Sequence, residues 1–352
     1  MKKNLRSKIL LCVLAGGVLA ANTALAAEYK EYTESISSGN ENYSTEIKSS
    51  DANGNYTYNF GQEAKLVINN ESRGISLDYT ENSTANKIII NNKLDISVTN
   101  KDNANPTYGL YLQSNGDKEI DRSGGGNINV LVEDSESSAF AMGSGVFLTA
   151  LSDSDNNVIK IGNTDIEVQV LNAKHGIEAY GLTSSGTGDN NKIIMGNGSI
   201  NIKANSVSKD SSGSDSVAAS GIAAYDNTEI ETGNVAIVVT ATGNGNILET
   251  IANGIAAEAG DAKVTTLNGS VTATAINTAD GETYANAILA GDGSNVTKFD
   301  GNITAVAEGE GTLAARGVNL WSDETVTNLG VVDISAKTIG GSTENGNWID
   351  SK

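Results

Sequence analysis

The sequence predicts an all-β protein that folds into a single right-handed parallel β-helix of about eight coils, with three short strands in each coil. Three observations lead to this prediction. A strand-like pattern recurs about every 34 residues, a second pattern that opens with glycine recurs between its copies, and the chain has 39 glycines but one proline. Internal repetition with a period of roughly 20 to 50 residues is typical of solenoids and related repeat folds.

The first pattern is a five-residue strand, such as Ile166-Glu167-Val168-Gln169-Val170, with apolar residues at every second position. This is the period of a strand that is buried on one face. The intervals between copies vary from 29 to 38 residues, as expected for coils of constant cross-section with loops of variable length. The copies occupy residues 94–98, 128–132, 166–170, 200–204, 235–239, 271–275, 303–307 and 332–336.

The second pattern is glycine, an apolar residue, any residue and a second apolar residue. It occurs at residues 74–77, 109–112, 145–148, 176–179, 221–224, 254–257 and 317–320, and at 287–290 alanine replaces the glycine. A third apolar patch lies between the other two patterns, as at residues 88–90, 158–161 and 193–195. Three apolar segments in each repeat predict three strands per coil.

A helical repeat is the alternative, because helical repeat families also have periods near this length. The alanine-rich segments 251–257 and 285–290 are compatible with helix. Strict alternation of β-branched residues, with Asn-Gly and Gly-Asn pairs at the turns, favours strands instead. We therefore expect each strand to pair in parallel with its equivalents in the coils above and below, around a core of Ile, Val, Leu and Ala. Residues 27–60 are expected to form an N-terminal cap, and residues 61–352 the β-helix.

Residues 1–26 have the organisation of a signal peptide. A positively charged start precedes an apolar run from Ile9 to Ala21, which is too short to span a bilayer. The small residues Ala24 and Ala26 then favour cleavage after Ala26, with cleavage after Ala27 as the second choice. An uncleaved membrane anchor is the alternative. We expect export by the general secretory route.

The charge and cysteine content of the mature protein follow from this cleavage. Residues 1–26 contain four Lys/Arg, no Asp/Glu and the only cysteine, Cys12, so their removal changes the formal charge from −20 to −24. The mature protein is therefore expected to lack disulfides. Such a negative charge argues against binding to nucleic acid or to an anionic membrane through a basic face. No cofactor is expected.

Candidate catalytic and metal-binding residues are few. The only histidine, His175, is expected to be a surface turn residue, because no credible Ser-His-Asp arrangement surrounds it. Asp165 and Glu167 could serve as paired carboxylates, but nothing in their spacing marks a cleft. Residues 153–157 lack the glycine and the distal glutamate of an EF-hand loop, so no metal site is predicted. Asparagine ladders along the turns are expected instead. Residues 291–294 are interpreted as a turn, and the Asn-x-Ser/Thr segments at 268–270 and 302–304 as turn and strand composition.

A signal peptide followed by such coils, for example Gly254-Ile255-Ala256-Ala257, resembles the passenger region of an autotransporter over about residues 60–340. Autotransporters are Gram-negative proteins that are secreted through their own outer-membrane barrel. The resemblance implies a location at the cell surface or outside the cell, and adhesion as the usual activity. The family's C-terminal barrel is absent from these 352 residues. We therefore favour a fragment, truncated at the C-terminus, over a solenoid that ends by other means.

Three functions follow as hypotheses from these observations. The first is adhesion or another cell-surface interaction without catalysis, with a protein or glycan of a host or neighbouring cell as the partner. The second is a secreted enzyme that cleaves polysaccharides, which requires a groove with two or three convergent charged side chains. The third is a structural stalk, which would have uniformly polar faces and neither a pocket nor an aromatic patch.

Overall fold

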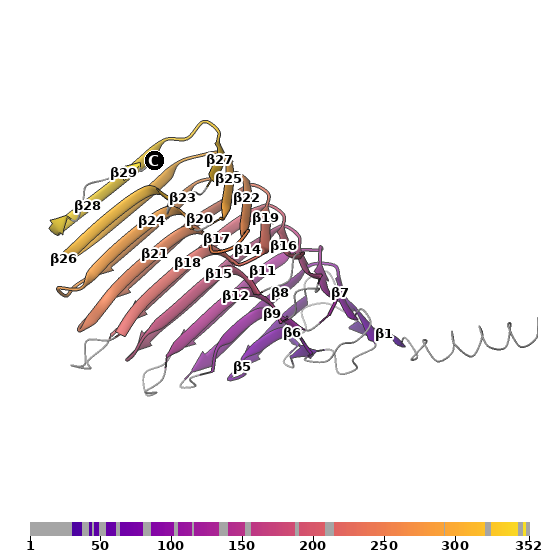
Figure 1. Cartoon of the computed structure of the whole chain (residues 1–352). Coiled ribbons are helices and arrows are strands. Elements are labelled where there is room, and N and C mark those ends of the chain that lie inside the picture. Colours follow the sequence, from indigo (N-terminus) through magenta and orange to yellow (C-terminus); the bar gives the residue numbers. More distant parts are fainter. Residues whose placement is uncertain are drawn as a thin grey trace, which may run out of the picture.

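The computed structural model is a solenoid of stacked parallel strands, as Figure 1 shows. In the described part of the chain, no helix is long and apolar enough to cross a membrane. The all-β fold class and the parallel stacking are confirmed. The structure describes residues 30–36, 42–43, 46–48, 54–60, 64–79, 86–101, 105–114, 116–133, 140–151, 156–186, 190–207, 215–291, 293–320, 325–343 and 348–349.

The strands form three columns that run along the solenoid axis. Every pairing between neighbouring strands in a column is parallel and joins segments about one repeat apart, as between β10 and β13. The first column is a ten-stranded sheet, and its short strands follow one another at the right of Figure 1. It contains β1 (Lys30–Ile36), β4 (Gly54–Phe60), β7 (Asn86–Asn91), β10 (Lys118–Arg122), β13 (Asn157–Ile161), β16 (Asn191–Met195), β19 (Thr228–Thr232), β22 (Lys263–Asn268), β25 (Asn295–Asp300) and β27 (Thr325–Leu329).

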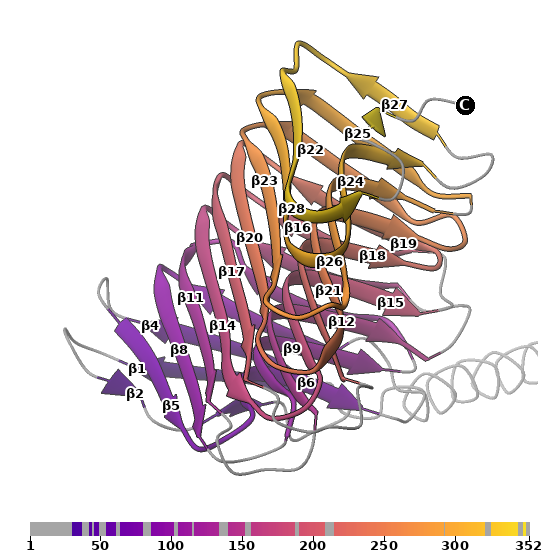
Figure 2. The ribbon, with the colours of Figure 1, turned by 90° about the vertical axis from the view of Figure 1, so that its left-hand side faces the viewer.

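The second column holds the eight predicted copies of the first pattern, with two further strands on the N-terminal side. Figure 2 shows several of its strands side by side. Seven of the eight predicted copies form strands over all five residues, whereas in the eighth the strand begins only at Ile334, which pairs with Ile303. The column contains β2 (Asn42–Tyr43), β5 (Ala64–Asn69), β8 (Leu94–Lys101), β11 (Gly126–Glu133), β14 (Thr164–Ala173), β17 (Gly198–Ser206), β20 (Val235–Gly243), β23 (Val271–Asn277), the first part of β26 (Ile303–Leu320) and β28 (Ile334–Thr343).

The third column holds the strands of the second pattern and joins the second column, because β26 pairs with both β23 and β24. The alanine-rich segments that are compatible with helix lie in strands of this column, which excludes the helical alternative for them. The column contains β3 (Ile47–Lys48), β6 (Arg73–Tyr79), β9 (Thr107–Ser114), β12 (Ala141–Ala150), β15 (Ile177–Gly186), β18 (Asp215–Tyr225), β21 (Ile247–Glu258), β24 (Glu282–Ala290), the second part of β26 and β29 (Trp348–Ile349).

The core consists of apolar side chains that stack on their equivalents one coil away. Ile96, Ile128, Ile166, Ile200 and Ile237 form one such stack, and each is at most 1% exposed. Alternation along each strand sends every second residue into this interior, as the sequence predicts. Burial of apolar surface along the whole axis stabilises residues 27–352, which contain no cysteine.

Three cations of the described residues, Arg122, Lys118 and Lys298, depart from the expected apolar interior. Arg122 is 0% exposed, and its guanidinium donates hydrogen bonds to the carbonyl oxygen of Leu94 (2.5 Å) and to Thr164 Oγ1 (3.2 Å). Burial lowers the pKa of Arg122 to about 10, against an opposing effect of Asp95. Lys298 Nζ donates to the carbonyl oxygens of Gly269 and Asp300 (2.6 Å each). Arg122 is the last residue of β10 and Lys298 lies two residues before the end of β25, and each satisfies backbone carbonyl groups there.

An asparagine ladder follows the turns between the first and second columns. The side-chain oxygens of Asn163, Asn197 and Asn234 each accept a hydrogen bond from the backbone N–H of the equivalent asparagine in the next coil, at 2.8–3.2 Å. Asp300 continues this pattern by accepting from the N–H of Val331 (2.9 Å). The prediction of asparagine ladders is therefore confirmed. The members of this ladder are Asn163, Asn197, Asn234, Asn268 and Asp300.

The segment that we expected to form the N-terminal cap contains strands of the same ladders. β1 pairs in parallel with β4, and β4 pairs with β7. The assignment of these residues as a cap stays a prediction. The signal peptide of residues 1–26 and the cleavage residues Ala24, Ala26 and Ala27 lie outside the described residues.

Candidate functional site

The strands of the third column bend at a glycine, and the bend makes their outer face concave. In β12 the residues before and after the bend, Ser144 and Val146, pair with Tyr180 and Leu182 of β15. The glycine between them has no space for a side chain, because a Cβ on Gly145 would lie 2.5 Å from a methyl group of Ile166. Two successive residues therefore face the interior, and the outward residues on either side of them converge.

One copy of the second pattern was assigned to the wrong glycine. The register pairs Tyr180 with Ser220 and Leu182 with Ile222, so the bend of β15 lies at Gly181 and not at Gly176. The residue three positions after Gly181 is Ser184, which is polar although it is fully buried. The apolar signature is therefore missing at the true position, and a similar sequence occurs by chance five residues earlier.

We call the concave face the bend groove, defined by the outward residues on both sides of the bend from β9 to β26. Its floor is fully buried at Ser144, Ala223 and Ala256, although none of them belongs to the apolar core. Outward residues of the second column, such as Asp165 and Glu167, are exposed by comparison. The groove therefore shields side chains that would otherwise lie on an open sheet surface.

Aromatic rings fill the N-terminal part of the groove. Tyr108 and Tyr111 flank the bend of β9 with ring centroids 4.8 Å apart, and Phe147 of β12 stacks on Tyr111 at 5.6 Å. The guanidinium of Arg73 lies over the Tyr111 ring at 3.8 Å and forms an ion pair with Asp78 (2.7 Å). Burial, with a smaller effect of the Tyr111 hydroxyl, raises the pKa of Tyr108 to about 12. Because of these contacts, the cluster is tightly packed and fills this part of the groove, and its tyrosine hydroxyls remain neutral.

Two tyrosine side chains fill the middle of the bend groove. The hydroxyl of Tyr180 forms hydrogen bonds with Tyr225 and with Glu178, which come from neighbouring coils and from both sides of the bend. Burial raises the pKa of all three groups above their ordinary values. The two phenols therefore remain neutral donors at physiological pH.

The groove opens into a pocket where this aromatic filling ends. The pocket has a volume of about 370 Å³ and is lined by residues of three successive coils. Its floor is apolar and its walls carry two carboxylates, two amides, a phenol ring and a guanidinium. The lining residues are Glu249, Ile251, Asn253 and Glu258 of β21, Tyr284, Asn286 and Leu289 of β24, and Arg316 of β26.

The ionisable groups of the pocket are left without ionic partners. Glu249, Glu258 and Arg316 form no hydrogen bond or ion pair with any described residue, and the Arg316 guanidinium lies 5.5 Å from the centroid of the Tyr284 ring. Burial raises the pKa of Glu258, and burial together with the charge of Glu282 raises the pKa of Glu249. Partly buried carboxylates without donors can accept hydrogen bonds from a ligand.

Buried amides form the back of the pocket. Asn286 Nδ2 donates to Asn253 Oδ1 (3.0 Å), and Asn319 Nδ2 donates to Asn286 Oδ1 (3.1 Å). Asn253 is 7% exposed, and its own Nδ2 group has no partner in the part of the chain that the structure describes. The ladder fixes the orientation of the Asn253 and Asn286 amides, both of which line the pocket.

His175 lies where the sequence predicts, in the turn between β14 and β15. Its Nδ1 atom is 3.5 Å from Asp215 Oδ1 at the start of β18. Asp165 and Glu167 lie on the exposed face of β14, where they accept hydrogen bonds from Ser199 (2.7 Å) and Gln169 (2.5 Å). The structure therefore does not place these three predicted candidates in the bend groove.

The acidic loop at residues 153–157 is only partly described. Residues 152–155 lie outside the described residues, while Asn156 donates to Asp117 Oδ1 through its backbone N–H (3.0 Å) and its amide (2.8 Å). No group of three His, Cys, Asp or Glu side chains that could hold a metal ion occurs among the residues searched. Ser294 donates its N–H to Gly291 O (2.9 Å), which confirms the turn expected there.

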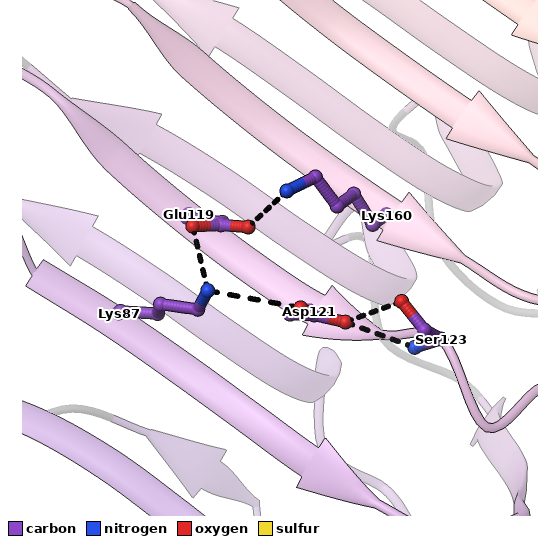
Figure 3. Close-up of polar contacts among 5 residues, drawn as sticks. All are labelled: Lys87, Glu119, Asp121, Ser123 and Lys160. Carbon is purple, nitrogen blue, oxygen red and sulfur yellow. Dashed lines mark hydrogen bonds and ion pairs between the residues drawn. The ribbon is translucent and has the colours of Figure 1, made fainter.

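A second charged cluster covers the outer face of the first column. Figure 3 shows Glu119 between Lys87 (2.9 Å) and Lys160 (2.7 Å), while Asp121 accepts hydrogen bonds from Ser123. Opposite charges alternate from coil to coil, so each carboxylate of this cluster is neutralised by the protein itself. The cluster therefore supports the stacking of coils and offers no unpaired group to a ligand.

The pocket residues were not predicted from the sequence. The sequence does contain a signal for them. At the glycine of the second pattern, the alternation of inward and outward residues is interrupted, because two successive residues face inward. Asn253, Asn286 and Arg316 each stand immediately before the bend position, and Glu258 stands four residues after it. Had the bend been recognised, these positions would have been placed on one concave face.

The chain matches no protein-family model, no curated protein and no solved structure at a significant level of similarity. The functional proposal therefore depends on the chain's own residues and geometry.

Proposed function

We propose that this protein is a secreted or surface-exposed β-solenoid that acts in adhesion or another cell-surface interaction, without catalysis. Its partner would be a protein or glycan on a host or neighbouring cell. The pocket of the bend groove is the single observation that carries this proposal, because no described residue forms an ion pair with its Glu249, Glu258 or Arg316. A stalk that serves only as a spacer requires neither this pocket nor the aromatic cluster beside it.

Support for the location comes from the N-terminal sequence and from the resemblance to an autotransporter passenger. We infer export by the general secretory route to the surface of a Gram-negative bacterium, with attachment through an outer-membrane barrel. Expression of the full chain in a Gram-negative host, followed by N-terminal sequencing of the exported protein, tests this. A new N-terminus at Ala27 supports it, and an intact N-terminus at Met1 contradicts it.

The adhesion proposal is tested with beads that carry the purified chain. We expect them to bind epithelial or bacterial cells, and we expect the double variant Tyr284→Ala/Arg316→Ala to bind at least about tenfold fewer cells. The control is Glu167→Ala/Lys203→Ala, which alters exposed residues of the second column outside the groove. Equal binding by the wild type and the groove variant would contradict the proposal.

A glycan-cleaving enzyme is the second candidate, because Glu249 and Glu258 line one pocket and both have raised pKa values through burial. A raised pKa is characteristic of the general acid in glycoside hydrolysis. Incubation with polysaccharides and measurement of new reducing ends tests this. Release that disappears in both Glu249→Gln and Glu258→Gln would favour the enzyme over the adhesin.

A further inference from the structure

We propose that the pocket between β21, β24 and β26 binds one uncharged sugar residue of a glycan. This inference rests on the proposed function, because it names the ligand class of the same groove. Its volume of about 370 Å³ is near the lower end of the range for small-molecule sites, which is roughly 300–1,000 Å³. A single ring with its substituents suits a pocket of this size better than a folded peptide segment does.

The polar groups of the pocket suit hydroxyl groups. A sugar hydroxyl both donates and accepts, and the pocket offers acceptors and donors side by side. Glu249 and Glu258 can only accept when ionised, Arg316 can only donate, and Asn253, which also lines the pocket, has an Nδ2 group with no described partner. Each of these polar groups is at least partly buried. A ligand that forms a hydrogen bond with such a group removes the free-energy cost of leaving it unpaired.

The apolar groups of the pocket suit the C–H face of a sugar ring. Tyr284, Ile251 and Leu289 line the same cavity, and the Arg316 guanidinium lies on one side of the Tyr284 ring at 5.5 Å. The Tyr284 hydroxyl donates to Glu282 Oε2 (2.7 Å), which holds the ring in place before a ligand arrives. A ring fixed in this way loses little conformational freedom on binding.

The charge of the pocket argues for an uncharged ligand. Two carboxylates around one guanidinium repel an anionic sugar, and the formal charge of −20 on the whole chain adds to that repulsion. For a cation, the Arg316 guanidinium offsets part of the attraction that the two carboxylates exert. A neutral glycan avoids the repulsion of an anion and uses both kinds of polar group.

The test is a titration of the purified full chain with uncharged trisaccharides of glucose, galactose, mannose and N-acetylglucosamine, and with a sulfated trisaccharide, followed by saturation-transfer NMR. We expect saturable binding to at least one neutral trisaccharide. Glu258→Gln, which keeps the shape of the side chain, is expected to weaken it about tenfold, and Tyr284→Ala at least as much. Glu167→Gln is the matched control and should leave the affinity unchanged.

The results separate this inference from the adhesion proposal. No saturable binding to any neutral trisaccharide, stronger binding to the sulfated one, or equal losses in Glu258→Gln and Glu167→Gln would each overturn the sugar site. If cells still adhere through the groove in that case, the adhesion proposal stands alone. If neutral sugars bind but cells do not adhere, the sugar site stands and adhesion fails. Thermal unfolding of each variant confirms that the pocket is folded when binding is measured.

Discussion

Asn197 Oδ1 accepts a hydrogen bond from the backbone N–H of Asn234, one coil further along the axis, at 2.8 Å. The backbone N–H of Asn197 in turn donates to Asn163 Oδ1 at 2.9 Å. Each side chain therefore satisfies the turn of the next coil, where the strand ladders do not reach. The same hydrogen bond repeats from coil to coil because equivalent turns lie directly above one another. The ladder therefore forms only when the coils are stacked in this register.

Replacement of Asn197 by alanine should remove one rung of this ladder. The N–H of Asn234 then loses its acceptor, and we expect the free energy of unfolding to fall by about 1 kcal/mol. Urea unfolding followed by circular dichroism measures the change. Asn201→Ala is the control, because Asn201 is exposed on β17, the strand that follows Asn197, and forms no hydrogen bond with a described residue. Equal losses in the two variants would contradict a specific role for the ladder.

Gly181→Ala should destabilise the bend of the third column. A Cβ at this position would lie 2.4 Å from both Gly221 O and Ile200 Cγ2, so the backbone of the neighbouring coil would have to shift. We expect a loss of about 1–3 kcal/mol, measured by thermal or urea unfolding. Ala287 shows that a methyl group fits at one level of the same column, so the cost depends on the local neighbours.

Gly291→Ala is the matched control for this prediction. A Cβ there would have its nearest neighbour at 3.5 Å, which is an ordinary van der Waals contact. We expect its unfolding free energy to stay within about 0.5 kcal/mol of the wild type. If Gly181→Ala proved as stable as Gly291→Ala, steric exclusion at the bend could not be the reason for glycine.

The columns of strands were predictable from the sequence because their periodicity is local. Alternation such as that of Ile128, Val130 and Val132 is sufficient to identify a strand and its buried face. The ladder at the turns was predictable for a similar reason, since asparagine and glycine cluster where the chain must turn. These features depend on the composition of a few consecutive residues.

The bend groove was not predictable in the same way. Its concavity arises where Gly254 allows two successive inward residues, and its lining combines Asn253, Arg316 and other residues that are one or two repeats apart. The sequence shows which residues face outward but not the angle at which a strand bends. The misplaced copy at Gly176 has the same origin, because the true bend at Gly181 is followed by polar Ser184.

Glu119→Gln should weaken the charged cluster of the first column. Burial raises the pKa of Glu119, but hydrogen bonds and charges from Lys160 and Lys87 outweigh it, so the net pKa is below the ordinary value. A lowered pKa contributes stability above the ordinary carboxyl pKa that is lost as the pH falls through the lowered value. We expect a loss of about 0.5–1 kcal/mol at pH 7 that shrinks in high salt and at pH 3.

The control for this cluster is Glu71→Gln, because Glu71 is exposed and forms no ion pair with a described residue. Urea unfolding at pH 7 and pH 3, at low and high salt, measures both variants. A loss in Glu119→Gln that is unaffected by salt and pH would show that the side chain contributes through packing and not through its charge.

Glu258→Gln should act in the opposite direction. Burial raises the pKa of Glu258, so the folded protein holds this proton more tightly than the unfolded chain does. Ionisation above the raised pKa therefore costs folding free energy, and neutral glutamine avoids that cost. We expect the variant to be more stable than the wild type at pH 7 by up to about 1 kcal/mol, and the difference to vanish below the ordinary carboxyl pKa.

Unfolding of both proteins between pH 3 and pH 8 measures this difference. The expected curve has no gain at low pH and a gain that appears as the wild-type carboxyl loses its proton. The same substitution is expected to weaken sugar binding, so stability and binding should change in opposite directions. A variant that loses stability at pH 7 would mean that the Glu258 carboxylate is stabilised within the fold, and its availability to a ligand would be refuted with it.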